Sequence, residues 1–301
     1  MLFERSKLWI KDKLGLEPGK PLWPFIYKTY KRISGIPRIK GGLGTLPDFI
    51  IIGTMKGGTT SLFNYLIQHP NVHSGCNKEI HFFDVNFEKG EKWYRAFFPL
   101  SFKRKIYGKN LKKPFKTGES SPYYLMHPLT PKRMGEVIPK AKLVVLLRNP
   151  ADRAYSHYYH NVRKKRETLS FDEALNKEKE RLSGEERKVI NGIDSYNYRN
   201  YSYIKRGLYA EQMERWYKHF PRDQIMIIES ERFFKDPQRY TNEVLRFIGL
   251  SPIKLKKYHK VNKGSYKKRS MEPETREMLQ RYFKKPNQDL YELIGKKFTW
   301  D

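Results

Sequence analysis

Four consecutive apolar residues lead directly into a glycine-rich turn near residue 50. Phe49 to Ile52 form the apolar run, and Gly53 to Ser61 read Gly-Thr-Met-Lys-Gly-Gly-Thr-Thr-Ser. Glycines let the backbone bend tightly and approach a ligand, and the free amides at a helix N-terminus attract anions. The pattern therefore predicts a buried strand, a turn and a helix that together bind phosphate or sulfate.

The order of residues in this turn differs from that of an ordinary nucleoside triphosphate loop. A Walker A loop has glycine, four residues, and then Gly-Lys-Ser/Thr. Gly53 and Gly58 have that separation, but Thr59 stands where the lysine belongs, and Lys56 lies inside the loop. We therefore expect a phosphate cradle of a different kind.

Strand and helix signals alternate along the rest of the chain. Strands are expected at 49–53, 115–119, 142–147 and 224–229, and helices at 59–68, 131–138, from about 151, at 209–220 and at 236–248. Strands separated by helices favour a mostly parallel sheet with helices on both faces. The predicted class is α/β, a three-layer fold like that of P-loop NTPases, with ligands beyond the carboxyl ends of the strands. The charged stretch 161–192 is expected to be a solvated helical excursion.

A glycine run, Gly41-Gly42-Leu43-Gly44, separates a basic extension from the main domain. We assign residues 1–46 to the extension and residues 47–301 to the domain. Aromatic residues alternate with lysines in the extension, a composition that suits the surface of an anionic membrane. A short helix packed on the domain is nevertheless the interpretation that we prefer, because the pattern is not cleanly amphipathic.

The charge of the chain is strongly positive. Its 301 residues include 61 Lys and Arg against 32 Asp and Glu, a formal net charge of +29. Such a charge indicates nucleic acid, acidic lipid or acidic polysaccharide as a partner, or simply a lysine-rich proteome. Cys76 is the single cysteine, so no disulfide forms within the chain. Because no apolar signal core or run of ~20 apolar residues is present, we expect a cytoplasmic protein, with peripheral membrane contact as the variant.

A second anion site is indicated where another apolar run ends. Arg148 follows the run 142–147, and Ser156 lies on the expected next helix. An arginine fork and a hydroxyl at a strand end can hold a second phosphate. In P-loop ATPases an aspartate for magnesium usually follows such a strand, and Arg148-Asn149 stands there instead.

These two segments together resemble the sulfotransferases that use 3′-phosphoadenosine 5′-phosphosulfate (PAPS). Three more segments resemble the heparan sulfate class, which includes its 3-O- and N-sulfotransferases: Lys78 to Asp84 (Lys-Glu-Ile-His-Phe-Phe-Asp), Gly118 to Tyr124, and Lys285 to Leu293 with the final Phe298-Thr299-Trp300. The resemblance covers residues 47–301. It implies sulfuryl transfer from PAPS to a hydroxyl, or less readily an amine, of a carbohydrate acceptor, which leaves adenosine 3′,5′-bisphosphate (PAP).

The resemblance also implies roles for individual residues. Lys56 would meet the bridging oxygen of the leaving phosphate, Glu79 would be the general base, and His81 is the alternative base. The residues implied to hold the nucleotide are Lys56, Gly57, Gly58, Thr59, Thr60, Ser61, Arg148, Ser156, Tyr209, Lys263 and Gly264. The competing interpretations are simple anion binding by Lys56, a surface position for Glu79 and a core position for Tyr209.

The chain departs from the family pattern at three places. Ser265 stands where an arginine commonly follows the pair Lys263-Gly264, and Ser120 stands where animal heparan sulfate 3-O-sulfotransferases carry a lysine. The cysteine pair that staples a hairpin in the animal relatives is absent. The missing cysteine pair indicates a microbial relative that is not secreted. Because of Ser120, the acceptor contacts of the animal enzymes are not transferred to this chain.

Two other functions remain open at this stage. A P-loop kinase or NTPase fits the sheet and the glycine loop, but the lysine at position 59 and the aspartate after Leu147 are missing. A non-enzymatic protein that coats polyanions fits the charge, but no nucleic-acid-binding module is recognisable, so nucleic acid is not the expected partner. No metal site is expected, because the eight histidines show no paired ligand spacing.

Overall fold

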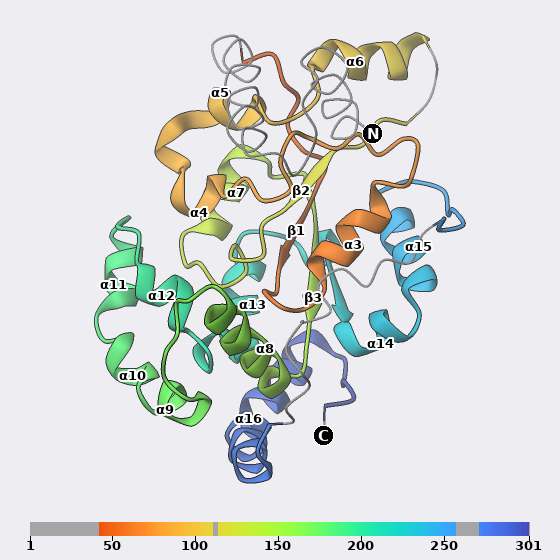
Figure 1. Cartoon of the computed structure of the whole chain (residues 1–301). Helices are drawn as coiled ribbons and strands as arrows, with labels where there is room; N and C mark the ends of the chain where they lie inside the picture. The colour runs from red at the N-terminus through yellow and green to blue at the C-terminus, as the bar shows by residue number, and fades with distance from the viewer. Residues whose placement is uncertain (1–41, 111–113, 257–270, 301) are drawn as a thin grey trace, which may run out of the picture.

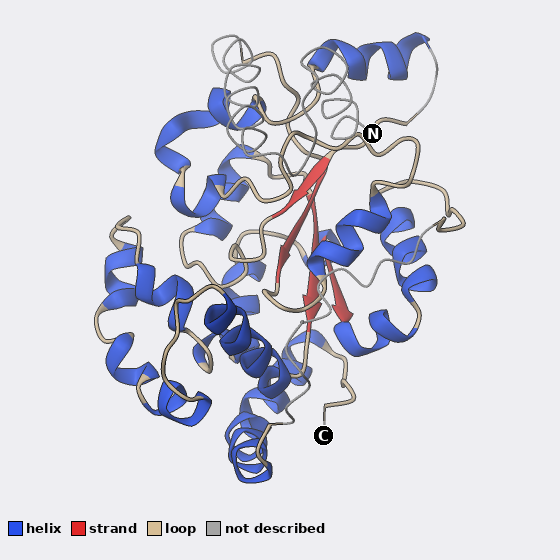
Figure 2. Ribbon diagram, viewed as in Figure 1, coloured by secondary structure: helices blue, strands red, loops and turns tan. Residues whose placement is uncertain are grey.

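A four-stranded, all-parallel sheet forms the centre of the computed structural model, which describes residues 42–110, 114–256 and 271–300 (Figures 1 and 2). The strand order is β2-β1-β3-β4. The strands are β1 (Phe49–Gly53), β2 (Gly118–Ser120), β3 (Lys142–Leu147) and β4 (Ile225–Glu229). Each neighbouring pair runs parallel, so the predicted sheet is confirmed.

Helices cover both faces of this sheet, as the apolar runs of its strands require (Figure 1). Successive side chains of a strand point to opposite faces, so Phe49 and Ile51 pack on one side and Ile50 and Ile52 on the other. The first face is covered by α3 (Thr59–Leu66), α14 (Ser230–Lys235) and α15 (Pro237–Phe247). The second is covered by α4 (Phe82–Val85), α5 (Gly90–Arg95), α7 (Thr130–Val137), α13 (Tyr209–Tyr217) and α16 (Pro273–Ile294).

The expected elements are present with small shifts at their ends. The largest shifts are at the end of α13, which was expected to reach residue 220 and ends at Tyr217, and at the start of β2, which was expected at 115–119 and lies at Gly118–Ser120. Phe49 pairs with Gly118 at the first position of β1, so pairing with β1 begins only there. A Cβ on Gly118 would lie 2.3 Å from the Phe49 carbonyl oxygen, which explains why a glycine starts this strand.

The charged stretch 161–192 is helical but contributes to a buried network. It follows α8 (Pro150–Arg163) and forms α9 (Phe171–Asn176), α10 (Glu178–Arg181) and α11 (Glu185–Ile190), before α12 (Tyr196–Tyr201) and η3 (Lys205–Gly207). Glu178 is buried and accepts the amides of Ile204 and Lys205 at 2.7 and 2.8 Å. These hydrogen bonds therefore hold the helical stretch 161–192 against the segment that leads into η3.

The remaining short elements lie between these. They are η1 (Phe87–Lys89), α6 (Ser101–Lys105), η2 (Ile106–Asn110) and η4 (Arg222–Gln224). No helix among the described residues is long and apolar enough to cross a bilayer. Most of the predicted extension 1–46 and the pair Lys263-Gly264 lie outside the described residues, so the proposed domain boundary stays a prediction.

Candidate active site

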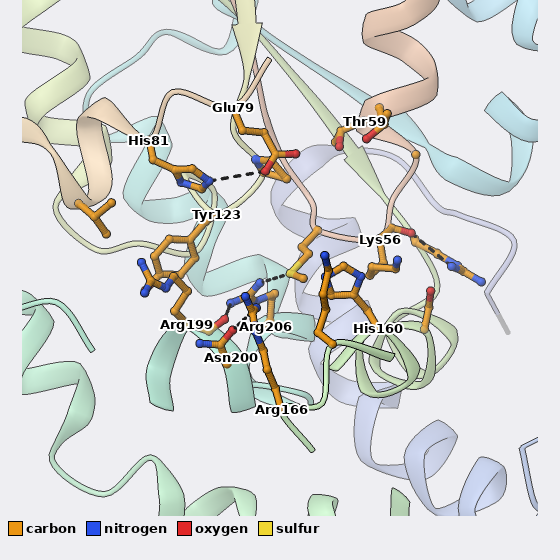
Figure 3. A pocket seen from close by; sticks show the side chains of 18 of the residues that line it. Lys56, Thr59, Glu79, His81, Tyr123, His160, Arg166, Arg199, Asn200 and Arg206 are labelled. Carbon is orange, nitrogen blue, oxygen red and sulfur yellow. Dashed lines mark hydrogen bonds and ion pairs between the residues drawn. The ribbon is translucent and has the colours of Figure 1, made fainter. Parts of the chain in front are cut away.

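A cavity of about 690 Å³ opens where the carboxyl ends of β1 and β3 meet (Figure 3). Its lining comes from the turn after β1 with the start of α3, the segment 79–86, the pair Pro122-Tyr123, the stretch 148–166 around α8, the stretch from α12 to η3, and Phe234 of α14. The polar lining residues are Lys56, Thr59, Thr60, Ser61, Glu79, His81, Asn86, Tyr123, Arg148, Ser156, His160, Lys164, Arg166, Tyr196, Arg199, Asn200 and Arg206. Cations outnumber carboxylates among them, so the cavity suits an anionic ligand.

The turn after β1 is held in one shape by its glycines. Gly58 has a φ of 102°, in the left-handed region that favours glycine. A Cβ on Gly57 would lie 2.6 Å from the Leu146 carbonyl oxygen, and one on Gly58 would lie 2.7 Å from the Phe234 ring. Ser230 Oγ donates to the Gly57 carbonyl at 2.8 Å. The turn is thereby pressed against β3 and α14, and it presents the N-terminus of α3 to the cavity.

Lys56 and Arg148 form a cationic wall beside this turn. Burial lowers the pKa of Lys56 to about 8, and the nearby charges of Arg163 and Arg148 act in the same direction. The Arg148 guanidinium donates to the Lys56 carbonyl at 3.3 Å, and Ser156 lines the same cavity from α8. An anion bound here would relieve the repulsion among these cations.

Glu79 and His81 belong to a chain of charged groups at another wall. Lys78 Nζ lies 2.7 Å from Glu79 Oε1, His81 Nε2 lies 3.6 Å from Glu79 Oε2, and His81 Nδ1 lies 2.6 Å from Asp84 Oδ2. The Glu79 side chain is 42% exposed, so its carboxylate is accessible from the cavity.

The shifted pKa values of Glu79 and His81 keep both side chains charged at neutral pH. Burial alone would raise the pKa of Glu79, but hydrogen bonds and charges from His81 and Lys78 lower it to about 2. Burial alone would lower the pKa of His81, but Asp84 and Glu79 raise it to about 10. At neutral pH His81 is therefore an imidazolium, a group that can orient Glu79 but has no lone pair with which to accept a proton.

A buried polar cluster positions the Glu79 segment. Ser121 Oγ accepts the amides of Ile80 and His81 at 3.1 and 3.2 Å, and donates to Glu119 Oε2 at 2.6 Å. Glu119 is fully buried and also accepts the Tyr94 hydroxyl at 2.7 Å. The segment Gly118 to Tyr124, noticed in the sequence only as a resemblance, thus acts as the support on which the Glu79 segment rests.

The structure brings most of the sequence-predicted residues into one cavity. Lys56, Gly58, Thr59, Thr60, Ser61, Glu79, His81, Arg148 and Ser156 all line it. Gly57 lies behind its wall, and the buried Tyr209 donates its hydroxyl to the Arg148 carbonyl at 2.9 Å, a position that supports Arg148 from behind. The roles of all these residues, and those of Lys263 and Gly264 outside the described part, stay predictions.

Sequence reasoning missed the wall built from α8 to η3. Lys164, Arg166, Arg199 and Asn200 line the cavity there, and Arg206 is buried with one guanidinium nitrogen 2.8 Å from the sulfur of Met55 in the turn after β1. No motif marks Lys164, Arg166, Arg199 or Asn200, whereas Arg206 belongs to the segment Arg206 to Tyr209, which resembles a family segment near the nucleotide. The only sequence signal for these four residues was the positive charge of the stretch in which they lie.

Comparison with known proteins decides the family. A sequence profile described as "Sulfotransferase domain" matches residues 46–285. The chain belongs to the sulfotransferase domain family. Mouse heparan sulfate glucosamine 3-O-sulfotransferase 3B1 is 32% identical over 89% of this chain, and the corresponding mouse 3A1 protein is 32% identical over 86%. The predicted resemblance to the heparan sulfate class of this sulfotransferase family is therefore confirmed.

A solved structure supports the same assignment for the fold. The crystal structure of a sulfotransferase from Alicyclobacillus acidocaldarius is 32% identical in sequence and covers 85% of this chain and 98% of its own, with a TM-score of 0.64. The predicted fold class is thereby confirmed. The chain spans about two thirds of the mouse relatives, 69% of 3B1 and 66% of 3A1.

Proposed function

We propose that this sulfotransferase moves a sulfuryl group from PAPS to a hydroxyl group of a carbohydrate, with an amine as the less favoured acceptor. One observation carries the proposal. A single cavity holds the anion-binding turn with Lys56, the pair Arg148 and Ser156, and an accessible carboxylate, Glu79. Transfer between two substrates requires this kind of shared space, because the attacking and leaving atoms must lie in line.

The donor end of the cavity fits a nucleotide with two anionic groups. The hydroxyls and amides from Thr59 to Ser61, together with Lys56, would hold the 5′-phosphosulfate, and Arg148 and Ser156 would hold the 3′-phosphate. PAPS, when bound, supplies the sulfuryl group and a phosphate leaving group. The Lys56 ammonium would stabilise the charge that develops on that phosphate.

The acceptor end is assigned to the Glu79 wall. Glu79 would accept the proton of the acceptor hydroxyl, and the imidazolium of His81, fixed by Asp84, would orient the carboxylate. Tyr209 would hold the Arg148 backbone in place, since its hydroxyl bonds to that carbonyl.

We propose an acidic glycan as the acceptor. The names of the mouse relatives specify heparan sulfate, and Lys164, Arg166 and Arg199 add positive charge to the lining of the same cavity. Transfer of radioactive sulfate to heparan sulfate, but not to neutral dextran, would test this. Because the binding is electrostatic, we expect it to weaken steeply with salt.

We also propose a cytoplasmic protein that contacts anionic membrane at its periphery. A Dictyostelium discoideum relative, 27% identical, is named a membrane-associated sulfotransferase. Among the described residues Phe102 and Ile106 are 54% and 41% exposed beside Lys103 and Lys105, a mixture suited to a lipid surface. Flotation of the full chain with phosphatidylglycerol vesicles, and its failure to float with neutral vesicles, would support this contact.

The first test of the proposed function is thermal unfolding with PAP and, separately, with ATP and magnesium. A ligand at about 100 times its Kd adds about 2.7 kcal/mol, which is visible as a rise in Tm. We expect PAP to raise the Tm of the wild type and Arg148→Ala to lose most of that rise, because Arg148 would contact the 3′-phosphate. A rise with ATP and magnesium alone would indicate a kinase or NTPase, and no rise with either would favour a polyanion-binding protein.

A further inference from the structure

We propose that Lys78 is a positioning residue that couples the donor-binding turn to the general base. Its ammonium group contacts both Thr60 of α3 and the Glu79 carboxylate. Anion binding at α3 would therefore change the strength of the contact between Lys78 and Glu79. The inference rests on the proposed function, because it assumes that the donor binds at α3 and that Glu79 accepts the proton.

The geometry that carries this proposal consists of two short contacts. Lys78 Nζ donates to Thr60 Oγ1 at 2.6 Å and lies 2.7 Å from Glu79 Oε1. Thr60 lies in the first turn of α3, where the backbone amides are free to bind an anion. Lys78 is 22% exposed and lies next to the cavity between these two groups. One side chain therefore contacts both the donor end and the acceptor end.

The charges explain what this contact does in the free protein. Glu79 is held between two cations, Lys78 and His81, and it is strongly stabilised as a carboxylate. A carboxylate stabilised in this way is a weak proton acceptor. The protein without donor thus holds its base in a fixed but poorly reactive state.

Donor binding would redistribute the hydrogen bonds of Lys78. An ammonium group has three donors and no acceptor, and anionic oxygens near Thr60 would compete with Glu79 for them. As the hold on Glu79 weakens, its basicity increases. The base would then be most reactive when the sulfuryl donor is in place.

Thermodynamic linkage makes this coupling measurable without an acceptor. If an anion at α3 weakens the contact between Lys78 and Glu79, then removal of the Glu79 charge must strengthen binding of that anion by the same factor. The effect must pass through Lys78. By contrast, direct electrostatic repulsion between Glu79 and the anion would not depend on Lys78.

The experiment is a double-mutant cycle on PAP affinity, measured by calorimetry with the full chain. We expect Glu79→Gln to tighten PAP binding about fivefold in the wild-type background, at the lower end of typical coupling. In the Lys78→Met background the same change should alter the affinity less than twofold. Lys78→Arg keeps the charge and should restore most of the coupling. Lys177→Met is the matched control, since Lys177 forms an exposed ion pair with Glu180 at 2.8 Å away from the cavity lining and should leave the coupling unchanged.

Two results would overturn the inference. One is an equal effect of Glu79→Gln in both backgrounds, which would mean repulsion through space. The other is no effect of Glu79→Gln in either background. A wild type that does not bind PAP would overturn the proposed function as well, and this outcome is recognisable before any variant is measured. Thermal unfolding of each variant verifies that it is folded.

Discussion

Glu79→Gln should reduce sulfuryl transfer by about 10²- to 10⁴-fold, the range that a general base usually contributes. The amide keeps the size of the side chain but cannot take the proton of the acceptor hydroxyl. The measurement is incorporation of radioactive sulfate from labelled PAPS into heparan sulfate at saturating donor. PAP binding should persist, because the turn at α3 and Arg148 are unchanged.

His81→Gln is the comparison that separates the two candidate bases. The pKa of His81 is raised to about 10, so its imidazole is protonated at neutral pH and serves to orient Glu79. We therefore expect His81→Gln to retain more activity than Glu79→Gln. The reverse order, with Glu79→Gln close to wild type, would assign the base to His81.

Lys56→Met should lower kcat by about 10²- to 10³-fold, comparable with the loss of one donor that stabilises developing charge. Methionine has a similar length but cannot neutralise the leaving phosphate. The wild type should also show a pH effect. The pKa of Lys56 is lowered to about 8 in the free protein, so the charged form prevails below that pH and is lost above it. The kcat/KM for the donor should therefore decline as the pH rises through about 8.

Lys56→Arg and Lys164→Met are the controls for this second prediction. Arginine stays charged, so any activity that Lys56→Arg retains should not decline near pH 8. Lys164 follows α8 and lines the same cavity, and if the acceptor is an acidic glycan its loss should raise the KM of the glycan rather than lower kcat. An equal kcat in Lys56→Met and the wild type would reduce Lys56 to a binding residue.

Local sequence was sufficient to predict the strands, most of the longer helices and the positions of the two segments expected to bind anions. The apolar runs of β1, β3 and β4 are long enough to be read as buried strands, and glycines or prolines mark several helix ends. The turn between β1 and α3 is formed by consecutive residues, so its sequence motif is sufficient to predict its shape. Arg148 directly follows β3, and parallel strands end at one edge of a sheet, so its approach to Lys56 could be anticipated.

The rest of the site could not be read from local patterns, because its contacts join segments that are far apart in the chain. Lys78 meets Thr60 across 18 residues, and Ser121 supports the Glu79 segment across about 40. Arg166 follows α8 and Arg199 lies on α12, and the tertiary fold brings both to the same cavity.

The sequence by itself determined the α/β class, the anion-binding turn and the sulfotransferase resemblance, because each depends on residues that are close together in the chain. Only the tertiary structure decided the charge states of Glu79 and His81 and the set of basic residues from α8 to η3 that line the cavity. Both depend on which charged groups from distant segments come within a few ångströms of one another, and the strength of that interaction varies steeply with distance and burial.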